Sequence, residues 1–516
     1  MSDGKVGAVI NISSNALFLV IGECKAGKIK VLESLEYPLS IGRDTFNTGR
    51  VSQEKIEKTC KIIKGFKKLT REYKVASLRT VATTAVREAI NRDYLLDQIV
   101  GKTRIKVRIL DDSEEKGIIY REMLSEMSGN EELQKNKALI AYIGTGSLGV
   151  AWYKRGRLYS TQNIKLGSLK LTELLGELQS KTNRFHQIVE DYLSSFKEMI
   201  PKSSPFGKID HFVVCGQEIE IIASLCATPA GAGITQIPIA KLDELYDTLK
   251  SCTPLEVAQM YGIAEEVAEI LLPSLGIYRL LASFTKSKCI YASRVTLQDA
   301  LLKEILLTRE TKKRLENFRE DIVQCARTLG KRFFFDEEHG NRVVKNAMAI
   351  FQKLKTPYGL DENDALMLKV ASLVHDIGKY VNFTEHYRRS YELIRGSNLP
   401  GISQADLEII ALISLFHSNI IPSESDPAFG TLSMEQRVKV SKLAGILRLA
   451  DALDRSHSEK IDVIKVRLKD NEISLTIHSR EDILLEEWAF NSKARLFEEA
   501  FGLKASLKKK VNPVES

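Results

Sequence analysis

The chain contains 516 residues, of which 44% are hydrophobic and 28% are charged, with 12 prolines and 31 glycines. At roughly 100–200 residues per domain this length predicts several domains, and the composition excludes collagen-like, coiled-coil and disordered chains. With 75 Lys and Arg against 67 Asp and Glu, the net charge of +8 favours polyanionic partners without specifying one. The longest apolar runs are far shorter than the ~20 residues of a membrane helix.

The cellular environment is predicted from the cysteines and the amino terminus. The seven cysteines are scattered, odd in number and without a CxxC pair, which predicts reduced thiols. No basic start followed by an apolar segment opens the chain, so we expect no secretory signal, no membrane association and a cytoplasmic protein. The basic stretch 504–510 (KASLKKK) is typical of a frayed, solvated end.

The first elements alternate between strands and helices. Strands are predicted over 6–12, 16–21 and 28–32, and apolar residues at helical spacing after Ser52 predict an amphipathic helix over 53–73. The alternation then continues with a strand over 75–81, a helix over 83–100, a strand over 105–110 and a helix over 113–127. This order predicts an α/β fold.

A strand–turn–strand pattern like the opening one recurs over 138–153, and helical periodicity predominates from 303 to about 456. The repeat predicts a duplicated fold with a cleft between its halves. Strands over 463–468 and 473–478 and a helix over 483–501 end the pattern. The predicted domains are two α/β halves (1–128 and 129–305), an all-α domain (306–460) and a short α+β tail (461–516).

Five of the eight histidines lie between residues 339 and 457. His375 and Asp376 are adjacent at the end of an apolar helical run, while His339 and Asp451 lie on apolar helical patterns of their own. Imidazole and carboxylate ligands together suit Mn, Fe, Co, Zn or Ni and, with water ligands, Mg. A single buried histidine is more often a hydrogen-bonded core residue, so the prediction of a metal depends on the joint pattern.

His339, the run His375-Asp376-Ile-Gly-Lys379 and Asp451 resemble the H…HD…D signature of the HD phosphohydrolase superfamily. The resemblance implies that one divalent metal (Mn, Fe, Co or Mg) is held by His339, His375, Asp376 and Asp451. It also implies that His386 and His417 help to hold a second ion. Such a site would hydrolyse phosphate bonds, with Asp376 in the catalytic centre and Lys379 offsetting phosphate charge.

Segments 79–91, 114–120, 140–150 and 166–172 resemble, in order and spacing, those of the exopolyphosphatase/guanosine-pentaphosphatase (Ppx/GppA) family. The resemblance covers about residues 5–305, and segment 390–401 is similar to the helical region of that family. It implies a duplicated actin-like (ASKHA, ribonuclease H-like) fold followed by an HD-type helical domain. It also implies a polyphosphate or phosphorylated nucleotide as substrate, and a homodimer.

By this resemblance Glu115 is the catalytic glutamate that activates water, and Arg87 contacts phosphate. The backbone N–H groups of Gly144, Gly146 and Ser147, in the second loop, can also face phosphate. Other positions depart from the pattern of the family: Asn11 and Tyr142 replace Asp, and Gly149 replaces Glu. The second loop thereby loses two metal-handling carboxylates and the first loop its Asp, so we expect weak Mg²⁺ recruitment at this cleft.

The predicted function is metal-dependent hydrolysis of phosphoanhydride or phosphoester bonds at the HD site, with the N-terminal cleft as a polyanion-binding site or sensor. One alternative is an exopolyphosphatase that uses Glu115 to release terminal phosphate from polyphosphate or guanosine pentaphosphate. Another is a non-enzymatic, polyanion-binding regulator. No specific nucleic acid is expected as a partner.

Overall fold

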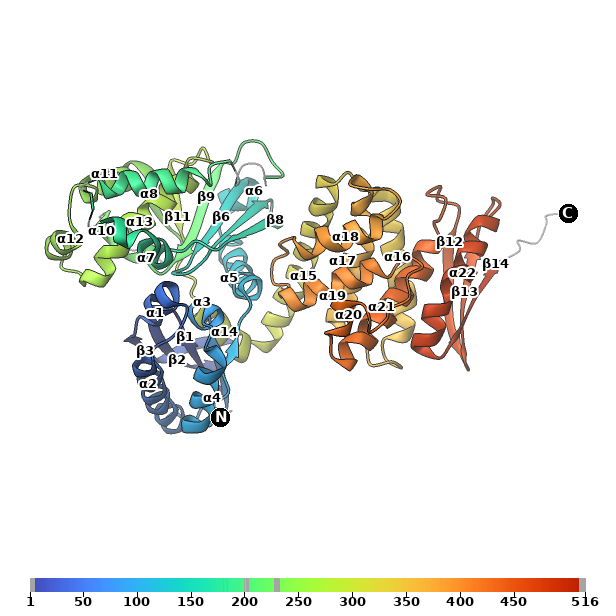
Figure 1. Cartoon of the computed structure of the whole chain (residues 1–516), viewed down its shortest axis with the longest axis horizontal. Helices are drawn as coiled ribbons and strands as arrows, with labels where there is room; N and C mark the ends of the chain where they lie inside the picture. The colour runs from blue at the N-terminus through green and yellow to red at the C-terminus, as the bar shows by residue number, and fades with distance from the viewer. Residues whose placement is uncertain are drawn as a thin grey trace. The chain divides into compact units, whose positions relative to one another are not determined.

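The computed structural model describes residues 5–179, 181–182, 184–198, 200, 204–226 and 233–509. The chain divides into two compact units, Met1–Asp321 and Ile322–Ser516, which are treated separately below (Figure 1). Among the described residues, no helix has both the length and the apolar character needed to cross a membrane.

The first half of the first unit contains a five-stranded sheet in the order β3-β2-β1-β4-β5. Pairing is antiparallel among β1, β2 and β3, and parallel from β1 to β4 and from β4 to β5. The strands are β1 (Lys5–Ile12), β2 (Ala16–Lys25), β3 (Lys28–Pro38), β4 (Ser77–Ala82) and β5 (Arg108–Ile109). The helices are α1 (Ile41–Thr48), α2 (Gln53–Glu72), α3 (Thr84–Glu88), α4 (Arg92–Thr103) and α5 (Asp112–Met127).

Helix α2 forms as its sequence predicts, whereas the helix predicted over 83–100 is interrupted. The Ser52 side chain caps α2 by accepting a hydrogen bond from the Lys55 amide, and the apolar face of the helix packs into the core of this half. The second prediction fails at residues 89–91, between α3 and α4. There the amide of Asn91 exchanges hydrogen bonds of 3.0 and 2.8 Å with the backbone of Val51, which fixes a non-helical link.

The second half repeats this topology in a six-stranded sheet in the order β10-β11-β9-β6-β7-β8. Strands β6, β7 and β8 are antiparallel, and β6, β9 and β11 are parallel, so three antiparallel strands again continue into parallel ones. The strands are β6 (Lys137–Ile143), β7 (Leu148–Lys154), β8 (Arg157–Ile164), β9 (His211–Gly216), β10 (Thr235–Pro238) and β11 (Cys289–Ala292). The helices are α6 (Glu131–Lys135), α7 (Ser168–Gln179), α8 (Phe185–Ser194), α10 (Ile219–Leu225), α11 (Ile239–Leu249), α12 (Pro254–Tyr261), α13 (Glu265–Ala282) and α14 (Leu297–Leu306).

Helix α14 returns to the first sheet, although its residues were assigned mainly to the second half. It packs against β1 and β2, where Gly7 lies against Ile305 and Leu306, and Gly22 lies against Leu302. A Cβ atom at Gly22 would approach Leu302 to 2.8 Å, so these glycines permit the close packing. The two halves are therefore tied together by the end of the second one.

The second unit is largely helical and ends in a three-stranded sheet. Its helices are α16 (Glu337–Leu354), α17 (Glu362–Val374), the 3-10 helix η1 (Ile377–Tyr380), α18 (His386–Arg395), α19 (Gln404–Leu415), α20 (Pro427–Gly430), α21 (Met434–Ala452) and α22 (Leu484–Phe501). Helix α15 (Thr308–Arg332) runs through the division between the units. The strands are β12 (Asp462–Lys469), β13 (Glu472–His478) and β14 (Lys504–Lys509).

Two features of this unit differ from the prediction. Residues 504–509 form strand β14, parallel to β13 with Leu507 opposite Leu475, and are not a frayed end; Lys510 lies outside the described residues. Its lysines suit an edge strand, because they discourage pairing with another chain. The α+β tail predicted over 461–516 also packs on the helical domain: α22 lies against α21, with Gly445 directly against the backbone of Phe497.

Candidate functional site

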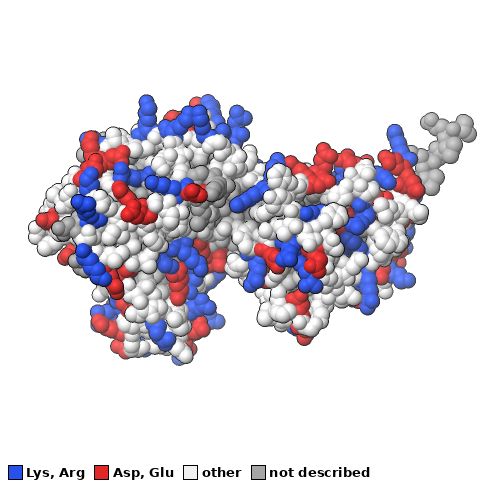
Figure 2. Space-filling model, turned by 45° about the horizontal axis from the view of Figure 1, so that its top comes forward, with Lys and Arg blue, Asp and Glu red and all other residues white. Residues whose placement is uncertain are grey.

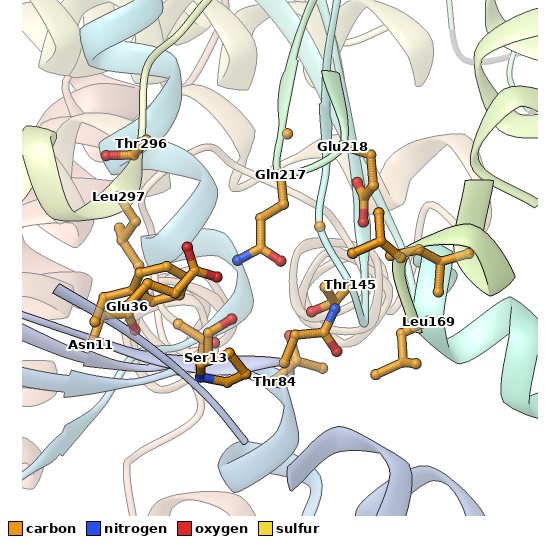
Figure 3. Close-up of a pocket in the computed structure, with 18 of the residues that line it drawn as sticks. Asn11, Ser13, Glu36, Thr84, Thr145, Leu169, Gln217, Glu218, Thr296 and Leu297 are labelled. Carbon is orange, nitrogen blue, oxygen red and sulfur yellow. The ribbon is translucent and has the colours of Figure 1, made fainter. Parts of the chain in front are cut away.

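The cleft of the first unit contains a cavity of about 830 Å³ that both halves line. Asn11, Ser13 and Glu36 face it from the first sheet, and Gln217 and Glu218 face it from the end of β9 (Figure 3). Glu115, Tyr142 and Gly144 also line it, as the sequence predicts for a cleft between two similar loops. Of the described lining residues, Arg43, Lys55 and Arg294 are the cations, and each is paired with a carboxylate.

Glu115 lies near the start of α5 and is only 4% exposed. Its Oε2 accepts a hydrogen bond from Arg87 Nη1 (3.1 Å), and its Oε1 accepts one from the Tyr142 hydroxyl (3.1 Å). Burial, and next the charge of Glu115, raises the pKa of Tyr142, so its hydroxyl remains a neutral donor. The structure thus brings Glu115 and Arg87 into direct contact, with both oxygens of Glu115 already engaged.

Behind Glu115 lies a second carboxylate, Asp112, for which the family pattern gave no signal. Lys116 Nζ lies 2.6 Å from Asp112 Oδ2, and Asp112 Oδ1 accepts hydrogen bonds from Arg87 Nη2 (3.1 Å) and Ser147 Oγ (2.8 Å). Burial would raise the pKa of Asp112, but Lys116 and Arg87 lower it below its ordinary value. Lys116 is 1% exposed, and the absent side chain of Gly149 leaves room for its stem, because a Cβ there would lie 2.7 Å from Lys116 Cδ.

The predicted phosphate loop is therefore engaged in internal contacts. The Gly144 N–H donates to the Ser147 carbonyl (3.0 Å), and the Ser147 hydroxyl is bound to Asp112. Gly146 packs against Thr84, and neither it nor Ser147 or Arg87 lines the cavity. This corrects the expectation that Gly144 offers its N–H to phosphate, because the tight turn itself uses that donor.

The second unit brings all the predicted metal-binding side chains together around Asp376. His339 lies in the first turn of α16, His375 directly follows α17, His386 begins α18 and His417 follows α19. Asp376 Oδ2 lies 3.9 Å from His339 Nε2 and 3.6 Å from His375 Nε2, while its Oδ1 lies 3.2 Å from His386 Nε2 and 3.6 Å from His417 Nε2. Two groups of possible ligands, His339-His375-Asp376 and Asp376-His386-His417, therefore share this carboxylate.

Asp451, on α21, completes the first group. Its Oδ1 lies 3.3 Å from His339 Nε2 and 3.5 Å from His375 Nε2. With metal–ligand bonds of about 2.0–2.2 Å, ligand atoms around one ion are about 3–4 Å apart. The observed separations fit that requirement.

Hydrogen bonds at the Nδ1 atoms orient the imidazole rings. The Nδ1 atoms of His375, His386 and His417 lie within hydrogen-bond distance of the carbonyls of Ser372, Phe383 and Ser414. A carbonyl can only accept, so each Nδ1 carries a proton and each Nε2 is directed at the carboxylates of the centre. His339 Nδ1 lies 2.8 Å from Asp454 Oδ2. Within the described residues, the buried Nε2 atoms of His339 and His375 have no hydrogen-bond partner.

The electrostatics of the centre favour a bound cation. Burial would raise the pKa of Asp376 and Asp451, but His375 and Lys493, respectively, are the strongest opposing influences and hold these pKa values well below the ordinary range. Burial, followed by the charge of His375, lowers the pKa of His417, which favours its neutral form. Burial would lower the pKa of His339, but Asp451, Asp454 and Asp376 raise it to about 9. The centre thus attracts a cation, which can be a proton or a metal ion.

Two lysines contact the carboxylates of this centre. Lys379 Nζ lies 2.5 Å from Asp376 Oδ2, and Lys493 Nζ lies 2.5 Å from Asp451 Oδ2. Lys379 was predicted, whereas Lys493 and Asp454 were missed. Asp454 follows Asp451 by three residues at the end of α21, so only its helical spacing could have indicated it. His457, for which no role was predicted, stacks on His339 with ring centroids 3.8 Å apart.

The first unit has the duplicated α/β architecture of actin-like proteins, and comparisons with solved structures agree. A Ppx/GppA family member from Aquifex aeolicus is 21% identical, with a TM-score of 0.50 over 59% of this chain and 99% of that one. An exopolyphosphatase from Cytophaga hutchinsonii is 16% identical, with a TM-score of 0.52 over 59% of this chain and 98% of that one. Identities this low show the fold alone.

The family itself is shown by sequence models. The model of the Ppx/GppA phosphatase family matches residues 20–309, and that of Ppx/GppA phosphatase domain III matches residues 323–494. The chain therefore belongs to the Ppx/GppA phosphatase family. The predicted family membership is confirmed, and the second match covers most of the helical unit.

Proposed function

We propose that this chain hydrolyses phosphoester or phosphoanhydride bonds at the histidine–aspartate centre of its helical unit, as an HD-type phosphohydrolase that uses one or two divalent metal ions. The observation that carries the proposal is the position of Asp376, whose two oxygens face two groups of histidines. Membership of a phosphatase family supports phosphohydrolysis in general.

The side chains of this centre have distinct chemical roles in the proposed reaction. A divalent ion bound there would supply an acidified water and positive charge for phosphoryl oxygens. The carbonyl-bound imidazoles keep their Nε2 lone pairs directed inward, and Asp454 fixes the ring of His339. Lys379 is 29% exposed and lines the same pocket as Asp376, so its ammonium can offset phosphate charge.

The test compares Asp376→Ala with Asp462→Ala, which removes an exposed aspartate that pairs only loosely with Lys345 (3.4 Å). We expect Asp376→Ala to lose bound metal and to lower phosphate release by more than about 100-fold, the upper loss typical of second-shell partners. Metal analysis and phosphate release from polyphosphate and a nucleotide panel give the readouts. Full turnover by Asp376→Ala would overturn the proposal.

The second candidate is an exopolyphosphatase that works at the N-terminal cleft with Glu115. Two observations favour it: Glu115 lines the cavity, and the phosphatase family model covers this unit. Against it, the described lining cations are paired, and basic and acidic side chains are interspersed on the face seen in Figure 2. Loss of polyphosphate hydrolysis in Glu115→Gln, with full activity in Asp376→Ala, would establish this alternative.

The N-terminal cleft has a sensor role in the first proposal. Polyphosphate added to the full-length Glu115→Gln variant would then change its turnover of nucleotides. Unchanged turnover would remove the sensor from the proposal. Bound metal without turnover of any phosphate compound would instead favour a non-enzymatic regulator.

A further inference from the structure

Aromatic side chains surround the mouth of the pocket that contains the histidine–aspartate centre. This pocket has a volume of about 470 Å³, and His339, His375 and Asp376 lie among its walls. Its other walls include five aromatic rings, those of Phe333, Phe334, Phe335, Tyr380 and Phe383. Phe334 is 81% exposed, Phe383 77% and Tyr380 59%. Clustered exposed apolar groups beside a polar centre mark a binding site more often than a random surface does.

The backbone holds one of these rings outward in a disfavoured conformation. Phe334 has φ = +50°, which is uncommon for a bulky aromatic residue. The amides of Phe333 and Phe335 both donate to the Gly330 carbonyl, and the Phe335 ring packs over Gly330 and Gly340. This anchored turn presents Phe334 to the pocket mouth, where it stacks on Tyr380 with centroids 5.7 Å apart and planes inclined by 21°. Strain of this kind persists where a function needs the geometry.

A cation lies between the rings and the centre. Lys379 Nζ is 5.9 Å from the centroid of Phe383 and 2.5 Å from Asp376 Oδ2. The pocket therefore offers positive charge at its polar end and flat apolar faces at its mouth. An inorganic phosphate chain can use the first feature but has no group for the second.

We propose that the helical unit binds nucleotides, with the phosphate at the histidine–aspartate centre and the base stacked on Phe334, Tyr380 and Phe383. That phosphate placement rests on the proposed function, whereas the stacking platform rests on the exposed rings. Stacking of a base on an aromatic side chain contributes about 1–3 kcal/mol, which corresponds to about 5- to 150-fold in affinity. The substrate class is thus a base-bearing phosphate compound and not inorganic polyphosphate.

The test measures equilibrium binding to the full-length protein, with and without Mn²⁺, by calorimetry. The probes are adenosine and guanosine 5′-monophosphate, and pyrophosphate serves as the ring-free probe. We expect Phe334→Ala and Phe383→Ala to weaken nucleotide binding by about 5- to 150-fold and to leave pyrophosphate binding unchanged. Trp488→Ala is the matched control, because Trp488 is a 65% exposed aromatic of the same unit outside this pocket.

Two results would overturn the stacking platform: nucleotide affinity within twofold of wild type in a variant that carries both Phe334→Ala and Phe383→Ala, or an equal loss for pyrophosphate. Failure of the proposed hydrolysis gives a different result. In that case the rings still determine nucleotide affinity, but neither the wild-type protein nor Asp376→Ala releases phosphate from any nucleotide.

Discussion

In the cleft of the first unit, the carboxylates of Glu115 and Asp112 have partners supplied by the chain itself, although Asn11 Oδ1 and Glu218 Oε2 in the cavity lining are buried without a hydrogen bond among the described residues. Glu115 is held by Arg87 and Tyr142, and Asp112 by Arg87, Lys116 and Ser147. In the helical unit, Lys379 and Lys493 contact Asp376 and Asp451, and the buried Nε2 atoms of His339 and His375 lie 3.3 and 3.5 Å from Asp451 Oδ1 without a hydrogen bond among the described residues. Buried polar atoms without a hydrogen bond cost free energy, so both centres keep atoms that a ligand can satisfy.

The comparison shows two ways in which one chain balances the charge of its carboxylates. Lys116 places an ammonium beside Asp112 in space that a side chain at residue 149 would otherwise contest. A fixed ammonium neutralises a carboxylate but cannot acidify a water molecule as a divalent metal does. The cleft thus balances Asp112 with a fixed ammonium, while under the proposed function the helical unit offers its ligand atoms to a metal ion.

The largest expected effect concerns the buried ammonium of the cleft. Lys116→Met leaves Asp112 without its closest cation, so we expect the first unit to lose about 3–5 kcal/mol of unfolding free energy. The chain has two tryptophans, and buried Trp152 reports the first unit once Trp488→Phe removes the other signal. Lys135→Met, which removes an exposed lysine, is the control. A loss below about 1 kcal/mol would show that Arg87 and Ser147 suffice for Asp112.

A smaller effect is expected from the partner of His339. Asp454→Ala removes the acceptor of the Nδ1 proton and should weaken Mn²⁺ binding by about 10- to 100-fold in calorimetric titration. Asp454→Asn keeps an acceptor oxygen and should lose less, which separates orientation from charge. If both variants bind Mn²⁺ as tightly as the wild type, the helical centre is not organised as a metal site.

The sequence predicted the elements that depend on local pattern. Apolar spacing located most helices, and a short motif with its flanking helices singled out His339, His375, Asp376 and Asp451, whose side chains lie together in the structure. Interactions across long stretches of chain were not predictable in this way. The break between α3 and α4 depends on Val51, and strand β14 depends on pairing with β13.

The remaining site residues were not predicted for the same reason. Lys493 reaches Asp451 from another helix, and Lys116 fits only because residue 149 is glycine. No periodicity in one segment encodes such a contact. Metal binding and the identity of the metal, the homodimer and the cytoplasmic location stay predictions.

The smallest expected effect tests whether Glu115 is held inactive. Tyr142→Phe removes one buried hydroxyl that donates to Glu115 Oε1, and the free energy of unfolding should fall by about 1 kcal/mol, the usual worth of one such bond. Trp152 fluorescence in the Trp488→Phe background measures this change. The variant also frees a lone pair of Glu115 that faces the cavity, without adding a metal ligand. We therefore expect no gain in phosphate release from polyphosphate, because the missing carboxylates remain absent. A clear gain would show that the Tyr142 hydroxyl alone restrains a working base, and the contrast between the two units would become one of regulation.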